Sequence, residues 1–200
     1  LPIWRFYARD ALVVAPELLH KVLVRRAPRE PELAARIVEV EAYRGADDPG
    51  SHAYRGRTAR NATMFGPAGL LYVYFTYGMH WCANVVTGAE GTASAVLLRA
   101  AAPFTGVDVM RSRRPAARRD RDLCSGPAKL CQAFGIDGGF DGIDLAGGDL
   151  VLVDDGTPPP DAPLVTTRIG LTPGRGDDHP WRFAVASDPN VSRGPRAAGG

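Results

Sequence analysis

The stretch LAARIVEVEAYRGADDPGSH (33–52) begins with an apolar alternation and ends in a charged loop. Apolar and polar side chains alternate over residues 38–43, and this period of two predicts a β-strand. The glycines and the proline that follow predict where the strand ends. Glu41 and Tyr43 therefore lie at a strand end, and His52 follows nine residues after Tyr43. Folding alone does not require that order of side chains. A site that binds a flat, polar ring attached to a polymer with an anionic backbone would use it.

The segments around this stretch predict further short strands. KVLVRR (21–26) alternates in the same way and is expected to pair with residues 33–43 as a hairpin. More strand-like segments, bounded by turn residues, follow at residues 69–78, 79–86, 94–103, 149–155, 164–171 and 181–187. Closely spaced strands with few helices predict an α+β fold, a single domain with a mostly antiparallel, curved sheet and surrounding short helices.

Three short helices are expected beside these strands. Pro16 fits the first turn of one of them, because proline lacks the N–H that a first helical residue leaves unpaired. FTGVDVMRSRR (104–114) is expected to begin a second. Ser125 is predicted to cap a third, with Pro127 near its start and Gly135 at its end.

The length and composition predict one domain. Two hundred residues, of which 45% are hydrophobic, are enough to bury a single core. No internal repeat is present, and GTPPPDAP (156–163) is expected to be a surface loop rather than a linker. We expect the domain to cover residues 1–193 and a disordered tail to cover residues 194–200. No segment approaches the ~18 consecutive apolar residues of a membrane span, and no signal peptide is visible.

The net charge of +2 conceals a strong segregation along the chain. Residues 52–121 hold ten arginines against three acidic residues, whereas residues 122–161 hold eight aspartates against one lysine. This asymmetry predicts a basic face for a polyanion, with the acidic part turned away. The alternative is that the two segments interleave on the surface.

The three cysteines predict a reduced protein. Cys82, Cys124 and Cys131 form no CxxC pair, and any disulfide would leave one thiol over. Reduced thiols and a cytoplasmic location are therefore expected.

Motifs for metals, nucleotides and covalent nucleophiles are absent from the sequence. Glu41, Asp47, Asp48 and His52 lie within twelve residues, but no HExxH, Cys/His quartet or DxDxDG loop accompanies them. The chain also lacks GxSxG, GxxxxGK[ST] and GxGxxG motifs. We therefore expect neither a metal nor a cofactor.

Glu41 and the tyrosines of LYVYFTYG (71–78) remain as candidates for chemistry. A carboxylate at a strand end can act as a general base when water lies within ~2.6–3.2 Å. The alternative, which composition alone favours, is a surface Glu41 paired with one of the many arginines. Alternation places Tyr72 and Tyr74 on one face of their strand. Tyr77 is expected at the hairpin tip, where an exposed ring can wedge into a base stack. The alternative is that all three tyrosines only pack.

Four blocks of the chain carry a resemblance to a known family. They are VEVEAYRG with SHAYRG and RN (38–61), MFGPAGLLYVYFTYGMHWCANVV (64–86), AVLLRAAAP (95–103) and DLCSGPAKLCQAFGID (122–137). In order and spacing they closely resemble the alkyladenine (3-methyladenine) DNA glycosylase family, the mammalian-type enzymes. The resemblance covers nearly the whole chain, from about residue 3 to residue 193.

The resemblance implies a catalytic water site. Glu41 would activate the attacking water, Arg99 would help to hold it, and the backbone carbonyl of Ile169 would complete its site.

The resemblance also implies residues that bind the flipped base and the DNA. The base would lie between the rings of three residues, Tyr43, His52 and Tyr74. Asn84 would form the pocket floor and select against normal guanine, and Tyr77 would fill the gap in the duplex. Residues expected to contact the DNA backbone or groove are Arg57, Arg60, Met79 and Lys129.

The implied function is a monofunctional DNA glycosylase. Such an enzyme would flip and hydrolytically excise alkylated or deaminated purines (3-methyladenine, 7-methylguanine, hypoxanthine, ethenoadenine) from duplex DNA and leave an abasic site. Strand cleavage would need an amine for a Schiff base, and the chain has only Lys21 and Lys129. We expect a monomer of bacterial type, acting on the nucleoid in base excision repair. The rivals are a noncatalytic binder of damaged DNA, a hydrolase of free sugars and a globule without a site.

Overall fold

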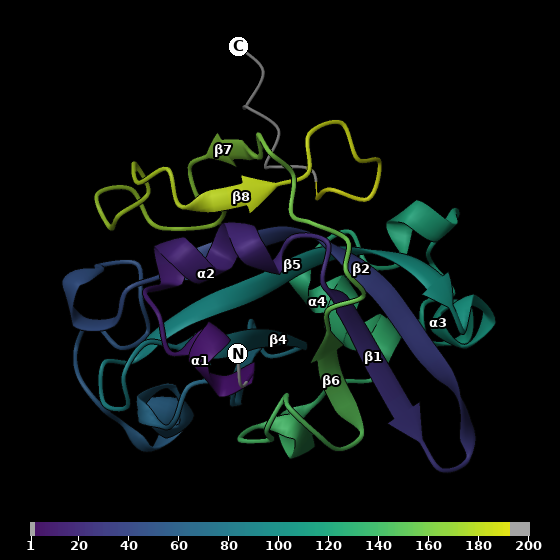
Figure 1. Cartoon of the computed structure of the whole chain (residues 1–200), viewed down its shortest axis with the longest axis horizontal. Helices are drawn as coiled ribbons and strands as arrows, with labels where there is room; N and C mark the ends of the chain where they lie inside the picture. Colours follow the sequence, from purple (N-terminus) through teal and green to yellow (C-terminus); the bar gives the residue numbers. More distant parts are fainter. Residues whose placement is uncertain (1–2, 193–200) are drawn as a thin grey trace.

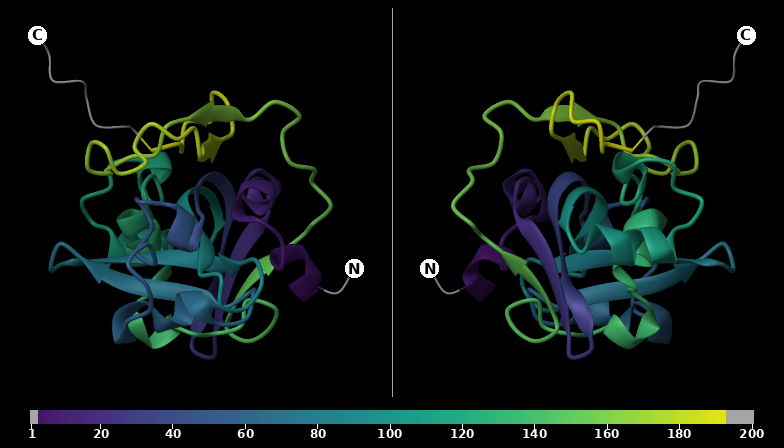
Figure 2. Two further views of the ribbon diagram at one scale, coloured as in Figure 1. Left: turned by 90° about the vertical axis from the view of Figure 1, so that its left-hand side faces the viewer. Right: turned by 90° about the vertical axis from the view of Figure 1, so that its right-hand side faces the viewer.

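A curved antiparallel sheet dominates the computed structural model, which describes residues 3–192 (Figures 1 and 2). The strands run in the order β3-β4-β5-β2-β1-β6, and β8 pairs with both β2 and β7. Their bounds are β1 Val22–Ala27, β2 Glu30–Tyr43, β3 Leu71–Thr76, β4 His80–Thr87, β5 Ser94–Thr105, β6 Leu150–Val153, β7 Leu164–Thr166 and β8 Arg182–Ala184. The α+β fold with an antiparallel sheet is confirmed.

Strand β2 is the centre of this sheet and decides where the C-terminal part of the chain lies. Its first half pairs with β1, with Val24 opposite Ala34, and β5 lies along its other edge. Beyond Arg36, which lies opposite the first residue of β1, that edge of β2 pairs with β8 instead, with Arg182 opposite Glu41. The end of β2 is therefore enclosed by β5 on one side and by a late segment on the other.

Short helices cover parts of the sheet, as Figure 1 shows. Their bounds are α1 Ile3–Tyr7, α2 Ala11–Leu18, α3 Val107–Arg113 and α4 Pro127–Phe134, with short 3-10 helices at Gly45–Asp47, Ala59–Phe65, Asp120–Asp122 and Gly138–Phe140. Helix α2 packs on β2 and β5, and α4 packs on β4 and β5. None of these helices is long and apolar enough to cross a membrane.

Two details of the predicted helices are wrong. Pro16 lies near the end of α2, which begins five residues earlier because the Asp10 carboxylate accepts a hydrogen bond from the amide of Leu12. Ser125 does not cap α4: the cap position belongs to Gly126, and no side chain bonds to it. Pro127 at the start of α4 and a left-handed Gly135 at its end are confirmed.

The charge segregation is only partly a surface feature. Of the arginines in residues 52–121, Arg99 is buried, and Arg111, Arg113 and Arg119 form ion pairs with acidic residues. Within residues 52–121, the exposed arginines that form no ion pair with any residue between 3 and 192 are Arg55, Arg57, Arg60, Arg118 and Arg121. The three cysteines are free and buried. The predicted tail, residues 194–200, lies outside the described residues.

Candidate active site

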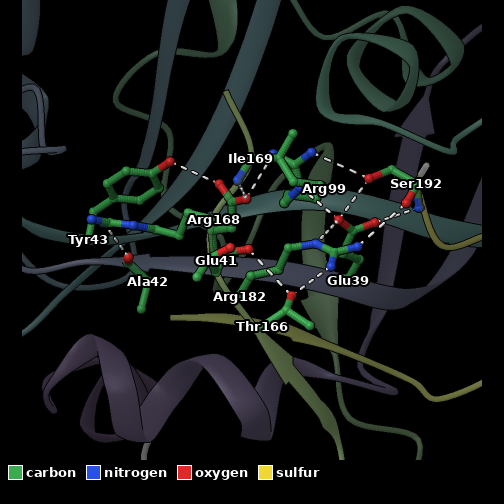
Figure 3. A network of polar contacts seen from close by, with 11 residues as sticks. Glu39, Glu41, Ala42, Tyr43, Arg99, Thr166, Arg168, Ile169, Arg182 and Ser192 are labelled. Carbon is green, nitrogen blue, oxygen red and sulfur yellow. Dashed lines mark hydrogen bonds and ion pairs between the residues drawn. The ribbon is translucent and has the colours of Figure 1, made fainter. Parts of the chain in front are cut away.

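Strand β2 places Glu41 in the interior, where three groups hold its carboxylate. Oε1 accepts a hydrogen bond from the backbone N–H of Ile169 at 2.7 Å and faces the guanidinium of Arg99 at 3.1 Å. Oε2 accepts a hydrogen bond from the hydroxyl of Tyr43 at 2.9 Å. The side chain is fully buried. The surface ion pair considered as an alternative is therefore wrong, because the pairing occurs inside the protein (Figure 3).

A cavity of about 300 Å³ lies beside this carboxylate. All three groups that hold Glu41 belong to residues that line the cavity, whereas Glu41 itself does not line it. The lining also contains four of the eight other predicted site residues, namely His52, Tyr74, Tyr77 and Asn84, but not Arg57, Arg60, Met79 or Lys129. A space of this size lies at the low end of ligand sites and suits one small ring system.

Aromatic rings form one wall of the cavity. The centroids of His52 and Tyr74 are 4.4 Å apart, with their planes at 76°. Tyr72 stacks on Tyr74 at 5.5 Å, and its hydroxyl lies 3.2 Å from Nδ1 of His52. Asn84 donates a hydrogen bond from its side-chain amide to the carbonyl of Tyr72 at 3.2 Å. Tyr72 is thus a site residue that the sequence reasoning did not assign, although alternation had placed it on the face of Tyr74.

Burial sets the protonation of this wall. Partial shielding of the His52 ring from water lowers its pKa, although the residue is exposed, and Arg60 contributes a smaller part, so the ring is neutral at neutral pH. Burial also raises the pKa of Tyr74, as does its hydrogen-bonded neighbour Cys82. The wall is therefore uncharged and rich in π-faces, which suits a flat ring and tolerates a positive charge on it.

The pKa of Glu41 reflects two opposed influences. Burial raises it above the ordinary value, and the nearby charge of Glu39 adds to that rise. The guanidinium of Arg99, the amide of Ile169 and the hydroxyl of Tyr43 lower it again, without overcoming burial. A carboxylate with a raised pKa is a stronger base than a free glutamate, provided that the pH lies above that pKa.

A second buried ion pair, between Arg168 and Asp48, packs against the ring of Tyr43. The guanidinium of Arg168 lies 4.6 Å from the ring of Tyr43 and 4.9 Å from the ring of Trp181. Two of its nitrogens bond to the carboxylate of Asp48 at 2.6 and 2.8 Å, and two backbone carbonyls accept further bonds. Arg168 does not line the cavity. Sequence reasoning missed this residue and treated Asp48 as part of a loop.

The loop carboxylates do not gather around a cation site. Arg99 engages Glu41, and Arg168 engages Asp48. Across residues 3–192, no three acidic, cysteine or histidine side chains come together as metal ligands.

The hairpin between β3 and β4 projects two apolar side chains into solvent. Tyr77 is 81% exposed and Met79 is 68% exposed. Tyr77 has a left-handed backbone, with φ at 51°, in the turn that closes the hairpin. Its predicted place at an exposed tip is therefore confirmed, and a globule in which every tyrosine is buried is excluded.

The other residues expected to contact DNA come from different segments of the chain. Arg60 donates a hydrogen bond to the carbonyl of Phe75 in β3, and Arg57 is exposed in the preceding loop. Lys129 lies on α4 and lines a separate hollow with Arg119 and Arg121. These cations therefore come from three segments, and Tyr77 lies at the mouth of the cavity.

Comparisons with known proteins agree with one another. The sequence model of the family described as "Methylpurine-DNA glycosylase (MPG)" matches residues 5–189. A protein of Burkholderia lata is 54% identical over 189 residues, which cover 94% of this chain and 88% of that protein. A protein of Streptomyces avermitilis is 54% identical over 191 residues, with 94% and 88% covered. A protein of Methanoculleus marisnigri is 48% identical over 192 residues, with 94% and 96% covered. All three are named "Putative 3-methyladenine DNA glycosylase".

Proposed function

The chain belongs to the methylpurine-DNA glycosylase family and is a DNA glycosylase, and from that premise we propose that it flips damaged purines out of duplex DNA and hydrolyses their N-glycosidic bonds. The substrates are alkylated or deaminated purines of the 3-methyladenine, 7-methylguanine, hypoxanthine and ethenoadenine class. The observation that supports this most directly is the buried Glu41, whose three hydrogen-bonding and ionic partners all line one aromatic-walled cavity.

Glu41 acts as the general base of this reaction. As the C1′–N bond breaks, the base leaves with the bonding electrons and the sugar acquires oxocarbenium character. Water then attacks C1′, and Glu41 takes a proton from that water. Its Oε1 already accepts two contacts, whereas Oε2 accepts only the hydroxyl of Tyr43. Oε2 therefore keeps more unused hydrogen-bonding capacity than Oε1, and we assign the contact with the water to it, with Arg99 and the carbonyl of Ile169 completing the water site.

The aromatic wall holds the flipped base. Stacking between a base and an aromatic ring contributes roughly 1–3 kcal/mol per base, and Tyr43, His52 and Tyr74 supply three rings at one cavity. A 3-methylated adenine or 7-methylated guanine is cationic, so the π-faces attract it. Because His52 is neutral, it adds no repulsion. Asn84 lies at the cavity and selects against normal guanine.

The exposed hairpin tip keeps the duplex open. Extruding a nucleotide costs a few kcal/mol, and a wedge that fills the vacated space offsets part of that cost. Tyr77 is the largest exposed apolar side chain beside the cavity. Arg57, Arg60, Met79 and Lys129 contact the backbone or groove around it, with arginine and lysine charges attracting phosphates. The protein acts as a monomer on duplex DNA without a cofactor. It works in the cytoplasm of a bacterial-type cell, on the DNA of the nucleoid.

A direct assay tests the proposal. Duplexes that each carry one candidate lesion are incubated with the protein and then treated with alkali, which cleaves at abasic sites. We expect alkali-dependent cleavage at 3-methyladenine or 7-methylguanine and none at an undamaged purine in the same sequence context. Binding to every lesion without any cleavage would instead support a noncatalytic binder, and cleavage of free nucleosides would support a sugar hydrolase.

We also expect that the enzyme leaves the DNA strand intact. Neither lysine lines the cavity: Lys21 pairs with Asp154 at 2.8 Å, and Lys129 lies on α4 beside the separate hollow. A Schiff base with the abasic sugar therefore lacks an amine at the reacting carbon. Borohydride added during turnover is expected to trap no covalent protein–DNA adduct, with a bifunctional glycosylase as the positive control. A trapped adduct would contradict this prediction.

A further inference from the structure

A second buried carboxylate, Glu39, lies two residues before Glu41 on strand β2. Oε1 of Glu39 accepts hydrogen bonds from Nε of Arg99, Nε of Arg182 and the hydroxyl of Ser192, each at 2.7 Å. Its Oε2 accepts the backbone N–H of Ser192 at 2.6 Å. The side chain is fully buried and does not line the cavity. Figure 3 shows that it lies beyond Arg99, on the side away from Glu41.

These contacts fix the orientation of Arg99. Glu39 holds its Nε, and the hydroxyl of Ser192 accepts a bond from one terminal nitrogen at 3.3 Å. The other terminal nitrogen is the one that meets Glu41 at 3.1 Å. A guanidinium is planar and rigid, so fixing two of its nitrogens sets the direction of the third.

The two glutamates and two arginines form one buried charge system. Arg182 bonds to Glu39 and to the hydroxyl of Thr166, so it balances one carboxylate while Arg99 bridges both. A buried charge that loses its partner is strongly unfavourable. Arg99 therefore interacts with both carboxylates. How strongly it stabilises the ionised form of Glu41 depends on whether Glu39 is charged.

We propose that Glu39 is a positioning residue for the glycosidic hydrolysis, acting through Arg99 to orient and tune Glu41. This inference rests on the proposed function, because it assigns to Glu39 an effect on the general base of that reaction. Its own carboxylate never meets the substrate. The late segment that carries Arg182 and Ser192 participates in the same arrangement by holding Glu39 in place.

Removing the charge of Glu39 is expected to change the pKa of Glu41 in one direction. Burial raises the pKa of Glu41, and the charge of Glu39 raises it further, while Arg99 lowers it. Without Glu39, Arg99 has Glu41 as its only counterion, so the pKa of Glu41 falls. The other titratable groups that face Glu41 are Tyr43, Tyr74 and Cys82, and burial raises the pKa of each, so all are neutral where the base titrates. The acid limb of the rate profile must then move to lower pH.

The test is the pH dependence of single-turnover excision by Glu39→Gln. A duplex with 7-methylguanine is suitable, because its cationic base needs no protonation before it leaves. We expect the plateau rate to fall roughly 10- to 100-fold, because misplacing a catalytic group by about 1 Å costs on the order of 10²-fold. At the same time, the midpoint of the acid limb is expected to move to lower pH. Glu17→Gln is the matched control, since Glu17 is a half-exposed partner of Arg9 on α2, and it should change neither quantity.

The outcomes separate the inference from the proposed function. A wild-type protein that excises nothing would refute the proposed function. An active wild type together with an unchanged Glu39→Gln would refute only the role of Glu39. A lower rate with an unmoved acid limb would show a merely structural role and would also overturn the inference.

A second variant keeps the test decisive if Glu39→Gln fails to fold. Ser192→Ala removes one donor to Glu39 and one contact of Arg99 while leaving every charge in place. We expect a several-fold lower plateau rate with lesion-DNA affinity retained. If Ser192→Ala excises at the wild-type rate, the positioning role is refuted.

Discussion

Glu41→Gln is expected to lose excision by about 10²–10⁴-fold, the usual contribution of a general acid or base, while lesion-containing duplex DNA still binds with wild-type affinity. Glutamine has nearly the same size and can still accept the amide of Ile169 through its carbonyl oxygen. The cavity and its aromatic wall therefore stay in place. What is lost is the group proposed to take the proton from water, together with the negative charge proposed to stabilise the developing oxocarbenium ion.

The measurement pairs single-turnover excision with equilibrium binding on the same duplex. Asp47→Asn is the control, because Asp47 is an exposed acidic residue of the loop that follows Tyr43 and should leave both quantities unchanged. If Glu41→Gln excised at the wild-type rate, the general-base assignment would be wrong. If the wild type itself bound lesions without excising them, the noncatalytic binder would be the better description.

Asp48→Asn is expected to lower the free energy of unfolding by about 3–5 kcal/mol, the cost of breaking a buried ion pair from one side. Both Asp48 and Arg168 are completely buried, and their bidentate contact measures 2.6 and 2.8 Å. Asparagine keeps the shape but leaves the guanidinium without a buried counterion. Arg168 also packs against Tyr43, so excision should decline as well.

Urea unfolding monitored by tryptophan fluorescence gives this difference. Glu32→Gln is the matched control, since its pair with Arg26 measures 2.7 Å but both side chains are about half exposed. Exposed pairs typically contribute no more than about 1 kcal/mol, so this control should stay within that range. A similarly small change for Asp48→Asn would show that water or another group satisfies Arg168, and would remove the argument that it supports Tyr43.

Local patterns predicted most of the sheet. Period-two alternation predicted the hairpin of β1 and β2, although residues 37–42 of β2 are buried on both faces. Aromatic and branched residues followed by a glycine turn predicted the hairpin of β3 and β4. The exposed Tyr77 followed from the glycine that turns that second hairpin. Helix starts were less certain, because proline and serine signals fit several positions. Pro16 and Ser125 were both assigned to the wrong one.

The sequence by itself determined the antiparallel α+β fold and, through its resemblance to a family, seven of the residues that line the cavity, although not Tyr72. Only the tertiary structure decided how these residues are held. Arg168 meets Asp48 across 120 positions of the chain, and Ser192 meets Glu39 across 153. The physical reason is that alternation and turn chemistry act between neighbours, whereas burial and charge pairing depend on which distant segment closes over a strand. Local sequence patterns do not distinguish an arginine that lies in solvent from one that lies between two buried carboxylates.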